Sequence, residues 1–267
     1  MKQFLICEFG LNPSKIMTLY DRPSDNFKIL SLSEQHEFLQ HVGSDLNWKV
    51  SPEETPFTRK SNGSVIKRHQ SILAITSTSW TPDEDFTPLY NVLDKYNTFA
   101  LDNDLVNLYL VITGKGPLKS VFEAKIKDQN WQKVKVSFAW LTSTDYPKMI
   151  GCADFGISLH QSSSGFDLPM KILDYFGCGV PVLAVNYNCI QELVVPNEFG
   201  LIWKDEAELF KHLKIVVEEY GSGDERLSSF RSNIFEHFQK DTWTTNWNSV
   251  ARPVVYSICG KASKKND

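Results

Sequence analysis

The sequence has 267 residues, 42% of them hydrophobic, and a formal net charge of −4 at pH 7. A chain of this length and apolar content folds as one large domain or two small ones with a sizeable core. The slight negative charge argues against a dedicated nucleic-acid-binding protein, because such proteins usually concentrate basic residues on one face.

Cysteine usage and hydropathy indicate the cellular setting. The five cysteines are scattered without C-x-x-C spacing, which predicts neither a disulfide framework nor a zinc site and fits a reducing compartment. No run of about eighteen apolar residues occurs, and residues 1–10 carry too short an apolar patch for a secretory signal. If the chain is whole, we expect it to stay on the cytosolic side of the membrane.

Residues 1–50 show the least regular pattern. Ser33 is placed to cap a helix that begins at Glu34 and ends at Gly43. The segment Asp21-Arg22-Pro23 predicts a loop, because a residue that precedes proline is disfavoured in the helical region.

Residues 51–70 are rich in Ser, Thr, Pro, Lys and Arg, and Asn62-Gly63 lies in their middle. This composition predicts a loop. Its basic side chains are Arg59, Lys60, Lys67 and Arg68. They are expected either to be solvated or to lie near a diphosphate on a flexible lid.

From Ser71 onward, short apolar runs alternate with amphipathic segments. The predicted strands cover residues 72–75, 108–112, 134–138, 155–159, 180–185 and 201–203. Apolar residues at helical spacing lie between them, over residues 117–127, 145–152 and 169–176. Strands that alternate with helices predict a parallel sheet covered on both faces, so the fold class is α/β with a Rossmann-like, doubly wound sheet.

Helical segments follow the last strand. Asp205 is placed to cap a helix that Gly221 ends, and another helix is predicted over residues 226–239. The final segment, from Trp243 to Pro253, places its apolar residues on one side.

The tetrapeptide Gly114-Lys115-Gly116-Pro117 follows a predicted strand and opens a helix. Its two glycines, Gly114 and Gly116, allow a backbone to approach a ligand closely, and the Lys115 ammonium is suited to a phosphate oxygen. An ordinary turn without a ligand is an equally weighted alternative to a phosphate site. The spacing matches neither a Walker loop nor a dinucleotide fingerprint, so ATP and NAD are not favoured.

A hydroxyl-rich cluster follows the strand predicted over residues 155–159, and its members are Ser162, Ser163, Ser164 and Gly165. In a parallel sheet such a loop lies at the carboxyl edge of the strands, where ligands bind. Hydroxyl and backbone N–H groups there donate to phosphate or sugar oxygens. An ordinary serine-rich loop is the alternative.

Four motifs occur together: TSWTPDEDF over residues 78–86, ITGKGPL over 112–118, WLTSTDYP over 140–147 and SSSGFDLPMKILDYFGC over 162–178. With these motifs in this order, residues 20–255 resemble the chitobiosyldiphosphodolichol β-mannosyltransferases. That family consists of GT-B glycosyltransferases that add the first mannose to the lipid-linked oligosaccharide of N-glycosylation. The resemblance covers the carboxyl-terminal half of the family's enzyme, which implies the donor-binding lobe.

The resemblance implies that Asp174 binds the nucleotide, because related retaining enzymes carry a glutamate there for the ribose hydroxyls. Their second glutamate is replaced here by Phe166, which fits an inverting mechanism. Related enzymes also carry an arginine for the diphosphate where Ser77, Thr78 and Ser79 stand in this sequence. The positive charge is therefore expected to come from Lys115, alone or with Arg59 or Lys60.

Two residues beside the serine cluster are candidate catalytic groups. Asp167 is expected either to orient the transferred mannose or to cap the helix that starts near Pro169. An inverting displacement requires a general base. His160, at the end of a predicted strand, is the nearest candidate for a catalytic or mannose-contacting group, and a structural role is its alternative.

Further candidates lie outside the serine cluster. Trp140 is expected either to form a wall for guanine or to be an ordinary packed tryptophan. Glu192 is expected either to reach the phosphate side of the donor or to be a surface charge. The acidic run Asp83-Glu84-Asp85 is expected to favour a helix amino end rather than to bind a metal ion.

The resemblance implies transfer of mannose from GDP-mannose to GlcNAc2-diphosphodolichol in β-1,4 linkage, at the cytosolic face of the endoplasmic reticulum membrane. The implied partners are GDP-mannose, the dolichol-linked chitobiose acceptor and other endoplasmic reticulum mannosyltransferases, with no nucleic acid and no cofactor. No residue is assigned to a metal ion, and the sequence leaves the need for a divalent ion open. The alternative is a catalytically inactive remnant of the enzyme, which binds GDP-mannose or has a regulatory role. The predicted division is a remnant of the amino-terminal lobe and interlobe segment (1–50), a nucleotide-sugar-binding domain (51–240) and a crossing helix with tail (241–267).

Overall fold

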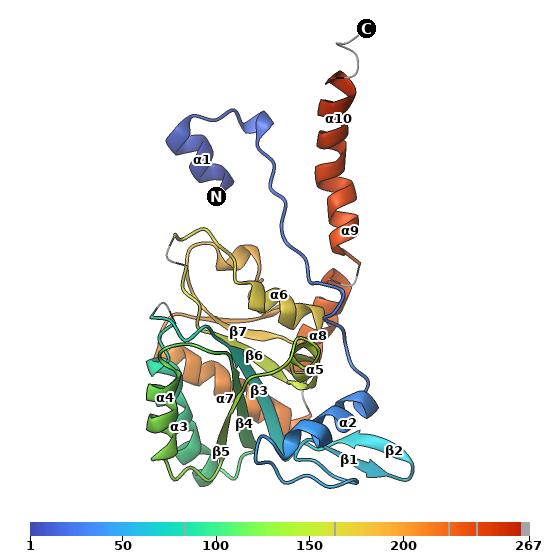
Figure 1. The fold of residues 1–267 in the computed structure, drawn as a ribbon. Helices are drawn as coiled ribbons and strands as arrows, with labels where there is room; N and C mark the ends of the chain where they lie inside the picture. Colours follow the sequence, from blue (N-terminus) through green and yellow to red (C-terminus); the bar gives the residue numbers. More distant parts are fainter. Residues whose placement is uncertain (83, 163, 224, 239, 263–267) are drawn as a thin grey trace.

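A parallel six-stranded sheet organises the computed structural model, which describes residues 1–82, 84–162, 164–223, 225–238 and 240–262 (Figure 1). The strands are β3 (Ser71–Ser77), β4 (Asn107–Thr113), β5 (Val134–Ala139), β6 (Phe155–Ser158), β7 (Val182–Val185) and β8 (Gly200–Trp203). Their order is β5-β4-β3-β6-β7-β8, so the direction of winding changes between β3 and β6. Doubly wound sheets bind ligands beyond the carboxyl ends of the strands at such a point. The predicted Rossmann-like sheet is confirmed.

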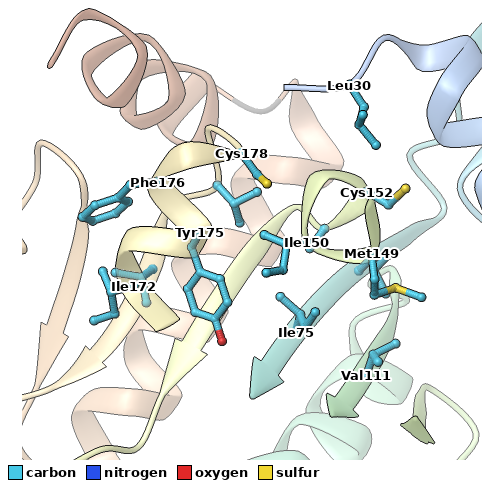
Figure 2. Close-up of a cluster of buried hydrophobic side chains, with 14 of the residues drawn as sticks. Leu30, Ile75, Val111, Met149, Ile150, Cys152, Ile172, Tyr175, Phe176 and Cys178 are labelled. Atoms are coloured by element: carbon cyan, nitrogen blue, oxygen red, sulfur yellow. The ribbon is translucent and has the colours of Figure 1, made fainter. Parts of the chain in front are cut away.

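The central strands are buried on both faces, and alternate side chains pack against different helices. On β3, Ile72 and Ala74 belong to one core and Leu73 and Ile75 to the other. The first core includes α3 (Thr87–Asp102), α4 (Lys119–Lys127) and α7 (Glu206–Ser222), and the second includes α2 (Leu32–Gly43), α5 (Asp145–Cys152) and α6 (Met170–Gly177). Helix α8 (Glu225–Phe238) contributes side chains to both. Figure 2 shows the second core, with Ile75 of the sheet beside side chains of α5 and α6.

Residues 51–70 form a hairpin, so the prediction of a plain loop is wrong. Strands β1 (Thr58–Ser61) and β2 (Ser64–Lys67) pair antiparallel. Asn62 and Gly63 both have positive φ, 51° and 80°, as a tight two-residue hairpin turn requires.

The hairpin also lies at the amino edge of the sheet. Lys67 Nζ donates to Asp154 Oδ1 at 2.7 Å, and Asp154 immediately precedes β6. The hairpin packs beside α2, at the opposite end of the sheet from α6 (Figure 1). The basic hairpin residues therefore do not form a lid at the carboxyl edge.

Helix α2 begins two residues earlier than predicted. Its cap is Ser31, whose side chain accepts from Glu34 N, while the Glu34 side chain accepts from Ser31 N at 2.8 Å. This reciprocal capping box needs a glutamate three residues after the cap, which places the cap at Ser31 rather than Ser33. The predicted end at Gly43 and the predicted Asp205 cap of α7 are confirmed.

The two ends of the chain extend away from the sheet (Figure 1). They are α1 (Lys2–Phe9) with the short helix η1 (Pro13–Lys15), and α9 (Trp243–Asn246), η3 (Trp247–Ala251) and α10 (Arg252–Ala262). The two segments meet where Asn246 Nδ2 donates to the Tyr20 carbonyl oxygen at 2.7 Å. Among the described residues, no helix combines the length and apolar character needed to cross a bilayer.

Candidate functional site

A cavity of about 790 Å³ lies at the carboxyl edge of the sheet, and we call it the rim cavity. Its walls come from the loops that follow β3, β4, β5 and β6, and from the first turn of α6. Four of the predicted site residues line it: Gly114, Lys115, Trp140 and His160. The fold thus brings together residues that lie up to 46 positions apart in the sequence, from Gly114 to His160.

Two turns in direct backbone contact form the base of the rim cavity. Gly114 has a φ of +137°, and a Cβ atom there would lie 1.8 Å from the carbonyl oxygen of Thr78. A Cβ atom on Gly116 would lie 1.9 Å from the carbonyl oxygen of Ser79. Both glycines are therefore required by the contact between the turns after β3 and β4. Their role in approaching a ligand stays a prediction.

Lys115 and Trp140 form a pair on the wall of the rim cavity. Lys115 Nζ lies 4.0 Å from the centroid of the Trp140 ring, which is a cation–π contact. Trp140 is 63% exposed, so the alternative of an ordinary packed tryptophan is wrong. An exposed indole beside an ammonium group suits a ligand that carries both a ring and a phosphate.

The turn after β3 is held by a buried carboxylate. Thr78 Oγ1 donates to Glu84 Oε2 at 2.5 Å and accepts from Trp80 N at 2.8 Å. Trp80 has a φ of +55°, in a region that residues with a side chain rarely occupy. Lys171 Nζ donates to Glu84 Oε1 and forms an ion pair with it. Glu84 therefore does not serve as a helix-end acid, because its carboxylate is engaged inside this turn.

Asp174 lies next to the rim cavity rather than on its surface. Its Oδ2 accepts from the Tyr146 hydroxyl at 3.3 Å, and Tyr146 lines the cavity. The Tyr146 hydroxyl oxygen also lies 2.9 Å from Ser77 Oγ. Burial raises the pKa of Asp174 to about 6, and the Tyr146 hydrogen bond opposes this rise.

His160 and Asp167 are in direct contact. His160 Nε2 lies 2.7 Å from Asp167 Oδ2, and the hydroxyls of Ser162 and Ser164 donate to Asp167 Oδ1. The hydrogen bond from Ser162, followed by that from His160, holds the pKa of Asp167 below its ordinary value. Ser163 lies outside the described residues.

Asp167 does not cap α6, so that alternative is wrong. The residue at the cap position is Pro169, and no side chain caps the helix. The loop that carries Asp167 turns at Gly165, whose φ is +76°. Ser162 and Ser164 thus hydrogen-bond the carboxylate that contacts His160.

A second cavity, of about 830 Å³, lies on the other side of this loop. Asp167 and Glu192 line it, together with the segment 16–22. Glu192 Oε2 accepts from the Tyr20 hydroxyl at 2.7 Å, and this hydrogen bond raises the pKa of Tyr20 to about 12. Six of the predicted site residues therefore line one of two cavities, which the contact between His160 and Asp167 connects. The predicted site residues that line neither cavity are Gly116, Ser162, Ser164, Gly165 and Asp174.

Among the rim-cavity residues outside the predicted site set, Glu84, Tyr146 and Lys171 carry the ionisable side chains. All three belong to the four motifs that carry the resemblance. A signal was present for Lys171, because a lysine in the first turn of a helix opposes the helix dipole and needs a compensating partner. Tyr146 had no such signal.

Comparison with known proteins extends this description. Residues 91–219 match the family model "Glycosyl transferases group 1". A chitobiosyldiphosphodolichol beta-mannosyltransferase of Homo sapiens is 38% identical over 253 residues, which cover 90% of this chain and 54% of the human protein. The chain therefore contains a domain of the group 1 glycosyltransferases.

Other glycosyltransferases share the sequence or the fold. The UDP-glycosyltransferase TURAN of Arabidopsis thaliana is 36% identical over 90% of this chain and 58% of its own length. The crystal structure of Anabaena Alr3699/HepE in complex with UDP and glucose matches 95% of this chain and 60% of that chain, with a TM-score of 0.64 and 15% identity. The predicted architecture, the carboxyl-terminal lobe of a GT-B glycosyltransferase, is confirmed. The chain spans about half the length of the curated relatives it matches.

Proposed function

We propose that this chain supplies the donor-binding half of an inverting β-mannosyltransferase. The donor is GDP-mannose and the acceptor is chitobiosyldiphosphodolichol, in a β-1,4 linkage. The observation that carries this proposal is the rim cavity, where Lys115, Trp140 and His160 meet beyond the sheet's change of winding direction. The name and 38% identity of the human relative support the choice of reaction.

Each part of the donor has a candidate partner in this proposal. Trp140 stacks on the guanine, and Asp174 accepts hydrogen bonds from the ribose once Tyr146 turns aside. Lys115 leaves the Trp140 ring to bind the diphosphate, and the hydroxyls of Ser162 to Ser164 assist it. A cationic side chain beside the diphosphate contributes most to catalysis, because negative charge develops on the diphosphate as the glycosidic bond breaks.

The His160–Asp167 pair is the proposed base. Asp167 accepts the Nε2 proton of His160 and thereby leaves Nδ1 free to take a proton. The acceptor hydroxyl attacks the anomeric carbon, the bond from that carbon to the β-phosphate oxygen breaks, and GDP leaves with the electron pair. The hydroxyl proton passes to His160 Nδ1.

The proposed setting follows from the acceptor. A dolichol-linked acceptor resides in a bilayer, so the protein works at the cytosolic face of the endoplasmic reticulum membrane, in the pathway of N-glycosylation. Other mannosyltransferases of that membrane are proposed partners.

Calorimetry and a transfer assay test the function. The chain is expected to bind GDP-mannose and GDP with micromolar dissociation constants, and UDP more weakly. Transfer to lipid-linked chitobiose, where it occurs, is expected to fall about 10²- to 10⁴-fold in His160→Ala, which removes the base. Absence of binding to GDP-mannose would overturn the proposal, and binding without any transfer would support the inactive remnant instead.

A further inference from the structure

The proposed function assigns the diphosphate one cation, Lys115, although the ligand carries more than one negative charge. The turn after β3 carries no basic residue between positions 77 and 86, and Lys115 is the cation that the sequence supplies after β4. A nucleoside diphosphate carries at least two negative charges, so a single flexible ammonium group leaves part of that charge uncompensated.

Lys171 lies in the wall of the same cavity. It is the second residue of α6, where a cation is unfavourable because the positive end of the helix dipole is there. Its side chain is 15% exposed and that of Glu84 is 3% exposed, so both charges are largely removed from water. Removing two charges from water costs free energy, so this ion pair is weak evidence for a role in stability and suggests a functional role instead.

Glu84 fixes the position of Lys171. One carboxylate oxygen of Glu84 accepts from Thr78 Oγ1 and the other from Lys171 Nζ, so the carboxylate cannot rotate without breaking both contacts. An ammonium group has three N–H donors. Within the described parts of the chain Glu84 takes one of those donors, which leaves two for oxygens of a ligand in the cavity.

We propose that Lys171, oriented by Glu84, is the second cation that binds the diphosphate of the nucleotide donor, opposite Lys115. This inference deepens the proposed function and rests on it for the nature of the ligand. Lys171 is then a ligand-contacting residue, and Glu84 is a positioning residue that acts through Lys171.

A double-mutant cycle tests the pair, with guanosine, GMP and GDP as ligands in calorimetry. Lys171→Met is expected to weaken GDP binding about ten- to hundredfold, because a charge-assisted contact to phosphate is lost, and to leave guanosine binding unchanged. Glu84→Gln keeps an acceptor for Thr78 but loses the charge, and is expected to weaken GDP binding about three- to tenfold. Lys171→Arg is expected to retain most of the affinity.

The double variant Glu84→Gln/Lys171→Met keeps the test valid if Lys171→Met alone fails to fold, because it leaves no unpaired buried charge. It is expected to bind GDP as weakly as Lys171→Met, since Glu84 acts only through the lysine. Lys133→Met is the matched control, because Lys133 is 19% exposed and pairs with Asp104 at the start of β5, at the amino edge. Its GDP affinity should equal that of the unaltered chain.

Several outcomes would overturn the inference. GDP affinity that is unchanged in the double variant would show that Lys171 does not contact the diphosphate, and equal weakening for guanosine and GDP would assign the pair a structural role. If the unaltered chain binds UDP but not GDP, the proposed donor is wrong, and the same cycle with UDP decides the role of Lys171. If it binds neither nucleotide, both proposals are overturned.

Discussion

Two aspartates lie at opposite edges of the sheet, Asp154 at the amino edge and Asp174 at the carboxyl edge, and their surroundings are opposite. At the amino edge Asp154 is 2% exposed, and its oxygens lie 2.7 Å from Lys67 Nζ and 2.8 Å from Leu73 N. At the carboxyl edge Asp174 has, among the described residues, one side-chain hydrogen bond, from Tyr146 at 3.3 Å, and burial raises its pKa to about 6. A carboxylate with a full set of donors stabilises the fold, whereas one with few donors retains capacity for a ligand.

The largest effect is expected at the amino edge. Asp154→Ala should lower the free energy of unfolding by about 3 to 5 kcal/mol, because it leaves the buried Leu73 N–H and the Lys67 ammonium without their partner. Urea denaturation measures this change. Asp154→Asn is the control and should lose less, since its amide oxygen still accepts from Leu73. A loss below about 1 kcal/mol in the alanine variant would contradict the assignment of Asp154 as a structural carboxylate.

Replacement of Asp174, at the carboxyl edge, should raise the free energy of unfolding rather than lower it. The folded-state pKa of Asp174 is raised from 3.8 to about 6, so its charged form costs stability that is absent below pH 3.8 and complete above pH 6. Asp174→Asn should therefore increase the free energy of unfolding at pH 7.5 by at most about 3 kcal/mol, and by little at pH 3.5.

The pH dependence separates this explanation from better packing. Thermal unfolding at pH 3.5 and 7.5 measures the change in stability of the Asp174→Asn variant. An equal increase in stability at both pH values would contradict the role of desolvation. The same variant should weaken binding of GDP, because an amide is a poorer acceptor for ribose hydroxyls than a carboxylate.

The smallest effect concerns Trp140, which contributes to the site but little to the core. Trp140→Ala should leave the free energy of unfolding within about 0.5 kcal/mol of the unaltered value, because the side chain is 63% exposed. It should weaken GDP binding by about 1 kcal/mol, or roughly fivefold. Trp140→Phe is the control that retains a ring. Loss of stability without loss of GDP binding would show that Trp140 has a structural role, like Asp154, and does not bind the ligand.

The sheet was predictable from the sequence because its signal is local. Apolar runs such as residues 108–112 are too short for buried helices and alternate with segments at helical spacing, and β4 lies where that pattern predicts. The hairpin was missed because its strands are polar and short, although Asn62-Gly63 is a strong hairpin signal. The cap of α2 was missed because two serines compete and only the position of Glu34 distinguishes them.

The site was predictable only in part, because its chemistry depends on contacts between distant residues. The strand ends located Lys115, Trp140 and His160 at one edge. No local pattern indicates that Tyr146 covers Asp174, or that Glu84 pairs with Lys171 across 87 positions of the chain. The acidic run 83–85 suggested a helix end, and only the folded chain shows the carboxylate of Glu84 turned toward a lysine.

The close approach of Gly114 and Gly116 to the carbonyl oxygens of Thr78 and Ser79 has a consequence for altering donor preference. Since no methyl group fits between the two turns, neither glycine can be replaced without displacing the other turn. The opposing loop, residues 159–169, has no comparable backbone lock at Gly165, where a Cβ atom would meet nothing nearer than 3.7 Å. Randomised libraries aimed at new donors are therefore better placed in that loop than in the paired glycine turn.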